Sequence, residues 1–302
     1  MKRTRAAVIR RRRLAVTVTV ATVLLTTGVV LASELPASSH ANHHGAASSP
    51  STTTTTSPSD DASAAQASLV RTLKRFIATR HGSIAVAVYD GVDRRLLVVH
   101  PSLRGRTASI VKVDILETLL HRTGGHLTED ERETARSMIE NSDNDSATDL
   151  WNRDGGAAGV RAYNHLVGLH HTAPNVDWGD TTTSAADQVT LLRELLHPSS
   201  VLTDHSRRFA RSLMRNVEAD QRWGISAGVP SGAIIGIKNG WLPVSEDHDR
   251  WAVNSIGWVR GKGKAYEIAV ITQHDPTEEY GIASIEHIAR EVWGHVSARP
   301  SG

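Results

Sequence analysis

The chain has 302 residues, with 34 Lys and Arg against 32 Asp and Glu, so its formal net charge is +2. Seven of the cations precede residue 14, which leaves 27 basic against 32 acidic side chains, a net of −5, in the rest. Nucleic-acid binding is therefore not expected, because neutralising phosphates requires a cationic face. The absence of cysteine excludes disulfides, thiolate nucleophiles, Cys-ligated metals and the cysteine of a lipoprotein anchor.

An uncharged segment, residues 14–32, directly follows the basic start. This order is typical of a secretory signal, with small-x-small cleavage sites at 39–41 or 30–32. The length also just spans a bilayer, so a retained anchor is the alternative, and the arginines before residue 14 leave Sec and twin-arginine export open. We expect residues 1–41 to be a signal peptide or signal anchor. The rest is then exported, to the extracellular space or the cell envelope.

Residues 42–65 are rich in Ser and Thr and should form a disordered spacer, because such a segment buries too little to offset its chain entropy. Residues 66–299 form the expected domain. The scattered histidines show no metal-ligand spacing, so we expect neither a metal nor an organic cofactor.

Within this domain, Ser63 and Gln66 are spaced as a capping box before a helix that reaches Ile77. Strands are expected at 84–89 and 96–99, joined as a hairpin. Thr128 and Glu131 are spaced as a second capping box. The remaining expected elements are helices at 110–120, 128–139, 146–151, 157–166, 185–196 and 207–217, strands at 233–238, 251–259 and 266–273, and a closing helix at 282–296.

Strands that flank a helical insertion share a core only if they meet in one sheet. We therefore expect an α/β fold of the α+β type: a five-stranded, largely antiparallel sheet covered by the N- and C-terminal helices, with an all-helical lobe alongside. A cleft should form at the seam between the sheet and the helical lobe.

The first candidate motif is Ser109-x-x-Lys112, which puts both side chains on one face of a helix start. A serine is a poor nucleophile unless a base takes its proton, and a Lys in a dry cleft near other cations has a pKa low enough to serve. The alternative is a surface serine beside a surface lysine.

The second motif is Ser142-Asp143-Asn144. As an ordinary helix cap it needs no function. In a site, Ser142 would relay a proton between Lys112 and a leaving nitrogen, and Asn144 would hold a substrate amide.

The third motif is Lys238-Asn239-Gly240, expected at the end of a strand. Lys238 either extends into water or supplies a cation for a substrate carboxylate. The amide of Trp241 would then join that of Ser109 as the second oxyanion donor. The Trp241 side chain either narrows the cleft and stacks on substrate or covers the sheet edge.

Together and in this order, these motifs resemble the class A β-lactamase-like branch of the penicillin-recognising serine hydrolases. The resemblance spans about residues 66–297. It implies that Ser109 is the acylated nucleophile, Lys112 its base partner and Ser142 the proton relay. It also implies substrate contacts by Asn144 and Lys238. Asn239 and Trp241 are further candidate substrate contacts, although they depart from the family, which usually has Thr or Ser and then a small residue at these positions.

The chain departs from that family in the omega loop, at residues 170–179, which contains no Glu to activate the deacylating water. Asp177 is the only carboxylate there before Asp180, and a surface or packing role for it competes with that of a base. The 33-residue interval from Ser109 to Ser142 is shorter than in class A enzymes, which implies a more open cleft.

The expected function is an exported, monomeric serine hydrolase that forms an acyl ester at Ser109 with a β-lactam or a related amide or ester. Its substrate would be a small molecule or a peptidoglycan-like peptide, and only an N-terminal anchor would bind a membrane. The alternatives are a penicillin-binding-type D-Ala-D-Ala carboxypeptidase or esterase, and a non-catalytic cell-wall-binding module. In an active site, Lys112 and Ser142 should both reach Ser109, whereas a Trp241 side chain in that space would favour the binding module.

Overall fold

The computed structural model describes residues 58–299. The predicted signal segment, its cleavage sites and the spacer up to residue 57 lie outside the described residues. Within 58–299, no helix combines the length and the apolar composition needed to cross a bilayer.

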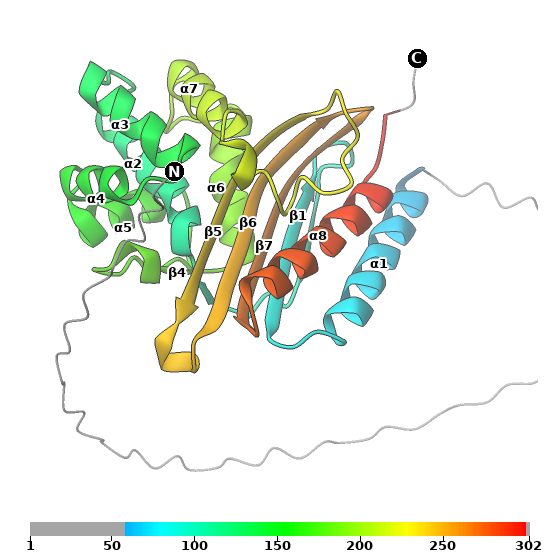
Figure 1. Cartoon of the computed structure of the whole chain (residues 1–302). Coiled ribbons are helices and arrows are strands. Elements are labelled where there is room, and N and C mark those ends of the chain that lie inside the picture. Colours follow the sequence, from blue (N-terminus) through cyan, green and yellow to red (C-terminus); the bar gives the residue numbers. More distant parts are fainter. Residues whose placement is uncertain (1–57, 300–302) are drawn as a thin grey trace, which may run out of the picture. The chain divides into compact units, whose positions relative to one another are not determined.

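A five-stranded antiparallel sheet forms the centre of the fold, in the order β2-β1-β7-β6-β5 (Figure 1). The strands before and after the helical insertion meet in this one sheet, as the sequence predicted, and the contact between the two groups is the pairing of β1 with β7. The strands are β1 (Ser83–Asp90), β2 (Arg95–Val99), β5 (Ile234–Val244), β6 (Arg250–Gly261) and β7 (Lys264–Asp275).

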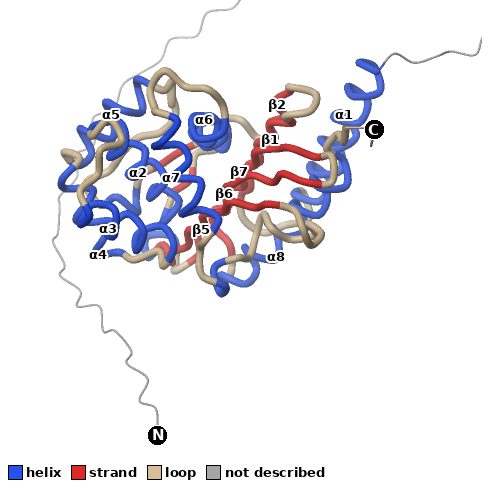
Figure 2. The backbone as a smooth tube through the Cα atoms, turned by 90° about the horizontal axis from the view of Figure 1, so that it is seen from above, coloured by secondary structure: helices blue, strands red, loops and turns tan. Residues whose placement is uncertain are grey.

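Helices cover both faces of this sheet (Figure 2). On one face lie α1 (Pro58–Ile77) and α8 (Glu278–His295), packed over one apolar cluster. On the other lies the helical lobe, packed over a second cluster. The predicted architecture is thereby confirmed. The lobe consists of α2 (Val111–Arg122), α3 (Glu129–Glu140), α4 (Asn144–Arg153), α5 (Gly156–Leu166), α6 (Ala185–Leu196) and α7 (Asp204–Arg215).

Two expected boundaries are wrong. Helix α1 begins at Pro58, so the last part of the predicted 42–65 spacer is helical and Ser63 does not cap the helix. Strand β5 continues to Val244, so the Lys238 motif lies in the middle of a strand. The capping box at Thr128 and Glu131 is present as predicted.

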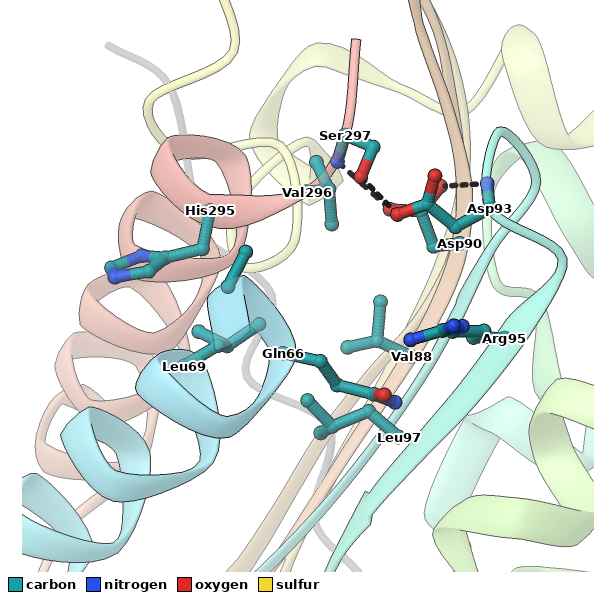
Figure 3. Close-up of a pocket in the computed structure, with 11 residues that line it drawn as sticks. Gln66, Leu69, Val88, Asp90, Asp93, Arg95, Leu97, His295, Val296 and Ser297 are labelled. Carbon is teal, nitrogen blue, oxygen red and sulfur yellow. Dashed lines mark hydrogen bonds between the residues drawn. The ribbon is translucent and has the colours of Figure 1, made fainter. Parts of the chain in front are cut away.

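The C-terminal end of α8 is fastened to the β1–β2 hairpin (Figure 3). The backbone N–H of Ser297 donates to Asp90 Oδ2 at 2.8 Å, and the N–H of Val92 donates to Asp90 Oδ1 at 2.8 Å. Gln66 on α1 donates to the carbonyl of Leu96 at 3.2 Å. The cavity between these elements is only about 30 Å³, the room of roughly one water molecule, so it is a packing gap.

Helix α2 is the central helix of the lobe and is buried at every residue from Val111 to Leu120. This run includes Asp114, which accepts a hydrogen bond from Asn164 at 3.1 Å. It also includes Glu117, which accepts one from Tyr163 at 2.7 Å. Burial raises the pKa of Asp114 to about 7 and that of Glu117 well above its ordinary value. The helix therefore carries two carboxyl groups whose protonated forms the fold favours.

A small second sheet, which the sequence did not predict, joins the start of the lobe to the omega-loop segment. Strand β3 (Gly105–Arg106) pairs with β4 (Thr182–Thr183). Each strand lies beside a short 3-10 helix, η1 (Ala108–Ile110) next to β3 and η2 (Trp178–Asp180) next to β4. This pairing brings the omega loop beside the Ser109 motif.

Candidate active site

Ser109 lies in a strained turn at the start of the helical lobe. Ala108 has a φ of +47°, the left-handed region that a non-glycine residue adopts only at a cost. The turn is held from the sheet, because the side-chain amide of Asn254 on β6 donates to the carbonyls of Arg106 at 2.9 Å and Thr107 at 3.0 Å. The backbone in front of Ser109 is therefore fixed before any substrate binds.

Gly240 lets β5 pack directly against this turn. A Cβ atom placed on Gly240 would lie 2.6 Å from the backbone nitrogen of Ser109 and 2.7 Å from that of Ile110. Both separations are too short for a real contact. Only a glycine therefore fits at position 240, because the backbone of β5 lies so close to the backbone of Ser109 and Ile110. The Ser109 amide thus lies directly beside β5, the edge strand of the sheet.

Lys112 is buried one helical turn after Ser109. Its Nζ donates to the carbonyl of Ser142 at 2.6 Å, to Asn144 Oδ1 at 2.8 Å and to Ser142 Oγ at 3.3 Å. Burial lowers its pKa to about 8, while the charge of Asp143 acts in the opposite direction. The first two motifs therefore converge on one ammonium group.

The turn that carries Ser142 is also strained, with a φ of +55° at Ser142 itself. Asp143 caps α4, its carboxylate accepting from the N–H of Ser146 at 2.7 Å. Asp143 thus forms the expected helix cap, and its neighbours Ser142 and Asn144 are the groups that contact Lys112.

Lys238 on β5 reaches the same hydroxyl from the opposite side. Its Nζ donates to Ser142 Oγ at 2.8 Å and to the carbonyl of Asn239 at 3.0 Å. Complete burial and the charge of Lys112 lower the pKa of Lys238 well below its ordinary value. Two lysines thus share one serine hydroxyl, and the ionisation of one opposes that of the other.

One expected contact is not formed. The side chain of Ser109 makes no hydrogen bond to Lys112 or Ser142 within residues 58–299, because the Lys112 ammonium is already engaged by Ser142 and Asn144. Catalytic hydrogen bonds are often long in an empty site and shorten only when substrate binds. Five of the predicted side chains (Ser109, Lys112, Ser142, Asn144 and Lys238) are nevertheless brought to one place, on η1, α2, the α3–α4 turn, α4 and β5.

The predicted substrate contacts of Asn239 and Trp241 need correction. Side chains alternate along a strand, so these two point to the face of β5 opposite Lys238 and Gly240. The amide of Asn239 donates to the carbonyls of Gln221 and Trp223, at 2.9 and 3.1 Å, and Asn239 is buried. Trp241 packs edge-on against Trp223, with ring centroids 5.6 Å apart. Their side chains brace the strand from behind, and the Trp241 ring does not fill the space beside Ser109.

The omega-loop segment closes one side of the site. Asp180 forms an ion pair with Arg106 at 3.1 Å, and the ring of Trp178 lies 5.0 Å from Lys112 Nζ. Asp177 is exposed, and neither Ser109 nor Lys112 forms a hydrogen bond to a carboxylate in the described part of the chain. A base for the water that would clear an acyl ester is not in place.

Sequence reasoning missed the residues that hold the site in shape. Asn254 and Gln273 position the segment before Ser109 from neighbouring strands, Gln273 accepting from the N–H of Arg106 at 3.1 Å. Their only sequence signal is a polar residue in an otherwise apolar central strand. Trp178 was missed because the loop was searched for carboxylates. Among residues 58–299 no three His, Asp or Glu side chains are placed to hold a metal ion.

Comparison with known proteins gives a family and a fold. A sequence model of the Beta-lactamase enzyme family matches residues 130–296. The protein named "Putative lipoprotein LppW" from Mycobacterium tuberculosis is 29% identical over 171 residues, which are 53% of this chain and 54% of that protein. The chain thus spans about half the length of the curated relatives it matches.

Solved structures share the fold at low sequence identity. The extended-spectrum beta-lactamase TLA-1 superposes with a TM-score of 0.67 and 18% identity, covering 76% of this chain and 99% of that one. The structure named PBP-A superposes with a TM-score of 0.67 and 21% identity, covering 75% and 95%. Both likenesses extend over almost the whole of the other chain.

Proposed function

Because the chain belongs to the Beta-lactamase enzyme family, we propose that it is a serine hydrolase whose Ser109 is acylated by β-lactams or by related amide and ester substrates. The observation that carries the proposal is the convergence of Lys112 and Lys238 on the hydroxyl of Ser142 beside the Ser109 turn. A merely structural module has no need of two buried lysines in a cleft, because burying each ammonium costs free energy.

In the acylation step, Ser109 Oγ attacks the carbonyl carbon of the substrate and its proton passes to the neutral form of Lys112. The carbonyl oxygen becomes an oxyanion, which the amides of Ser109 and Trp241 stabilise. When the intermediate collapses, the C–N bond breaks and Ser142 delivers a proton to the leaving nitrogen. The proton on Lys112 resupplies Ser142, since these two groups already share a hydrogen bond of 3.3 Å.

Lys238 has the task of receiving a substrate carboxylate. In the empty site its ammonium form is opposed by Lys112 and by burial. A bound carboxylate reverses this balance, because an opposite charge favours the protonated lysine. The substrate class that fits is therefore an acyl donor with a carboxylate close to the scissile bond, as in β-lactams and in peptides ending in D-Ala-D-Ala.

The second half-reaction is expected to be slow. A positioned general base contributes about 10² to 10⁴-fold to such a step, and Asp177, the one carboxylate among residues 170–179, is exposed and forms no hydrogen bond to Ser109 or Lys112 in the described part of the chain. The ester at Ser109 should therefore persist, which favours inefficient β-lactam hydrolysis or a penicillin-binding-type peptidase over a fast β-lactamase.

The location at the cell envelope belongs to the same proposal. The charge pattern of residues 1–32 is that of an export signal, and the matched relative is named a lipoprotein. The printed sequence contains no cysteine, so the anchor that we propose is the segment 14–32. We propose a monomer that acts on a small molecule or on peptidoglycan-like peptides, without nucleic acid.

Hydrolysis of a chromogenic cephalosporin and the mass of the intact protein, followed together over time, test this function. An adduct that lasts for hours with little colour change supports a penicillin-binding type, and rapid turnover supports a β-lactamase with another base. Neither an adduct nor hydrolysis with any penicillin, cephalosporin or D-Ala-D-Ala ester would overturn the proposal and leave a non-catalytic cell-wall-binding module.

A further inference from the structure

The side chain that faces Lys112 from the omega loop is an indole, not a carboxylate. Lys112 Nζ lies 5.0 Å from the centre of the Trp178 ring, within the range at which a cation is attracted to an aromatic face. The indole N–H donates to Thr148 Oγ1 at 3.1 Å, and that hydroxyl donates to the carbonyl of Asn144 at 3.0 Å. Trp178 is thereby tied to the helix that carries the Lys112 ligand Asn144.

The backbone of Trp178 is fixed from the other side. Its carbonyl accepts the N–H of Thr181 at 3.1 Å, and the carbonyl of Thr181 accepts the N–H of Thr107 at 2.8 Å. The ion pair between Asp180 and Arg106 adds a second link to the segment before Ser109. The ring is therefore held against the catalytic turn by contacts on both sides and is not a freely moving loop residue.

A cleft of about 570 Å³ borders this loop and is lined by Trp178, Thr148 and Leu242 and by the loop carboxylates Asp177 and Asp180. Lys112 has no exposed surface, although Trp178 is half-buried and borders the cleft. The indole thus lies between bulk water and the lysine that the proposed chemistry uses.

We propose that Trp178 is a positioning residue that covers Lys112, holding its ammonium group and keeping water from the ester at Ser109. This role rests on the proposed acylation of Ser109. For the ester to be cleared, a water oxygen must bond to the acyl carbon, give a proton to a base, and release Ser109 Oγ with a proton. An apolar ring offers that water neither a base nor a hydrogen-bond acceptor, so the ring prolongs the acyl-enzyme.

The same contact affects the proton on Lys112. The charged groups around Lys112 are Asp143 at the start of α4 and Lys238 on β5, with Asp177 and Asp180 flanking the indole on the loop. Removing the ring leaves these charges in place, removes the attraction between cation and ring, and opens the ammonium group to the water that the ring excluded. Because burial is the main cause of the low pKa of Lys112, hydration favours the ammonium more than the lost ring contact disfavours it, and the acid limb of the acylation rate should move to higher pH.

The experiment compares wild type with Trp178→Leu, which keeps an apolar side chain but has no ring. Benzylpenicillin is the probe, and intact-mass spectrometry records adduct formation and decay between pH 6 and 9. The expected result is a shift of the acid limb to higher pH and a faster decay of the adduct, because water reaches both the ammonium group and the acyl carbon.

Two further variants separate positioning from folding. Thr148→Val removes the acceptor of the indole N–H without touching the ring, and it should change decay in the same direction by a smaller factor. Trp223→Leu removes an indole from the opposite face of β5 and should leave the decay rate and pH limb as in wild type.

If wild type forms an adduct and Trp178→Leu forms one with unchanged decay and an unchanged pH limb, the role of Trp178 is wrong while the proposed function stands. Equal acceleration by Trp223→Leu would assign the effect to loosened packing and would also overturn it. If wild type hydrolyses benzylpenicillin without a lasting adduct, the role of Trp178 is wrong while the proposed function stands. If wild type neither forms an adduct nor hydrolyses the drug, the proposed function fails, and this role fails with it.

Discussion

Replacing Asp114 by Asn should stabilise the protein in a pH-dependent way. Asp114 lies in the buried α2 helix, and burial raises its pKa from 3.8 to about 7. The folded state therefore holds this proton more tightly than the unfolded chain, so stability falls as pH rises from about 4 to about 7. At 1.36 kcal/mol per pKa unit, this raised pKa lowers the free energy of unfolding of wild type, relative to its value at low pH, by about 2 kcal/mol at pH 5 and about 4 kcal/mol at pH 8.

Asn is neutral at both pH values and can keep the hydrogen bond that Asn164 donates to position 114. Its amide N–H groups would lack an acceptor, because Asp114 Oδ1 has no partner in the described part of the chain, but that cost of about 1 to 3 kcal/mol does not vary with pH. The quantity to measure is therefore how much the stability difference between variant and wild type changes from pH 5 to pH 8.

Urea unfolding followed by circular dichroism gives the free energy of unfolding of both proteins at pH 5 and pH 8. The difference, variant minus wild type, should grow by about 2 to 3 kcal/mol from pH 5 to pH 8. Val113→Ala, a neutral change on the same buried helix, should shift stability equally at both pH values. A difference for Asp114→Asn that is the same at pH 5 and pH 8 would refute the reasoning.

Three further predictions concern the site. Gly240→Ala should slow acylation at least about tenfold, because its Cβ would lie 2.6 Å from the Ser109 nitrogen; adduct formation at the wild-type rate in the folded variant would contradict this. The acylation rate should rise with pH to a plateau above about 8, since Lys112 acts in its neutral form and its pKa is about 8. Lys112→Arg, which cannot lose its proton, should abolish adduct formation; a flat pH profile would count against Lys112 as the base. Asp177→Asn should leave the lifetime of the adduct unchanged in a mass time course, whereas a longer lifetime would identify Asp177 as the base.

The architecture could be predicted from the sequence because its signals are local and repeated. The apolar periodicity of the elements, with strands on both sides of a helical insertion, allows one economical sheet. The early start of α1 at Pro58 could not be predicted, because the Ser- and Thr-rich composition of that segment is typical of disorder. The composition of this segment predicts disorder, whereas the structure is helical from Pro58 onward.

The site was predictable as a set of motifs but not as a set of orientations. Lys238 was expected to end a strand, yet β5 continues to Val244. In mid-strand the alternation of side chains sends Asn239 and Trp241 to the far face. A one-dimensional motif gives the order of residues, and only the register of β5 on β6 decides which of them face Ser109.

Contacts that depend on chain segments far apart were outside the reach of the sequence. Asn254 holds carbonyls nearly 150 residues earlier in the chain, and the Trp178 ring meets Lys112 only because β3 pairs with β4. No periodicity or local spacing reports such pairs.

The central claim is that Ser109 is the group that is acylated. The most direct measurement is the intact mass of the protein after incubation with benzylpenicillin, with Ser109→Ala treated in parallel. We expect a gain equal to the mass of the whole drug on wild type, because ring opening releases no fragment, and no gain on the variant. An adduct on both proteins would place the reaction at another nucleophile, and a wild type that is neither modified nor able to hydrolyse any β-lactam tried would contradict the proposed chemistry.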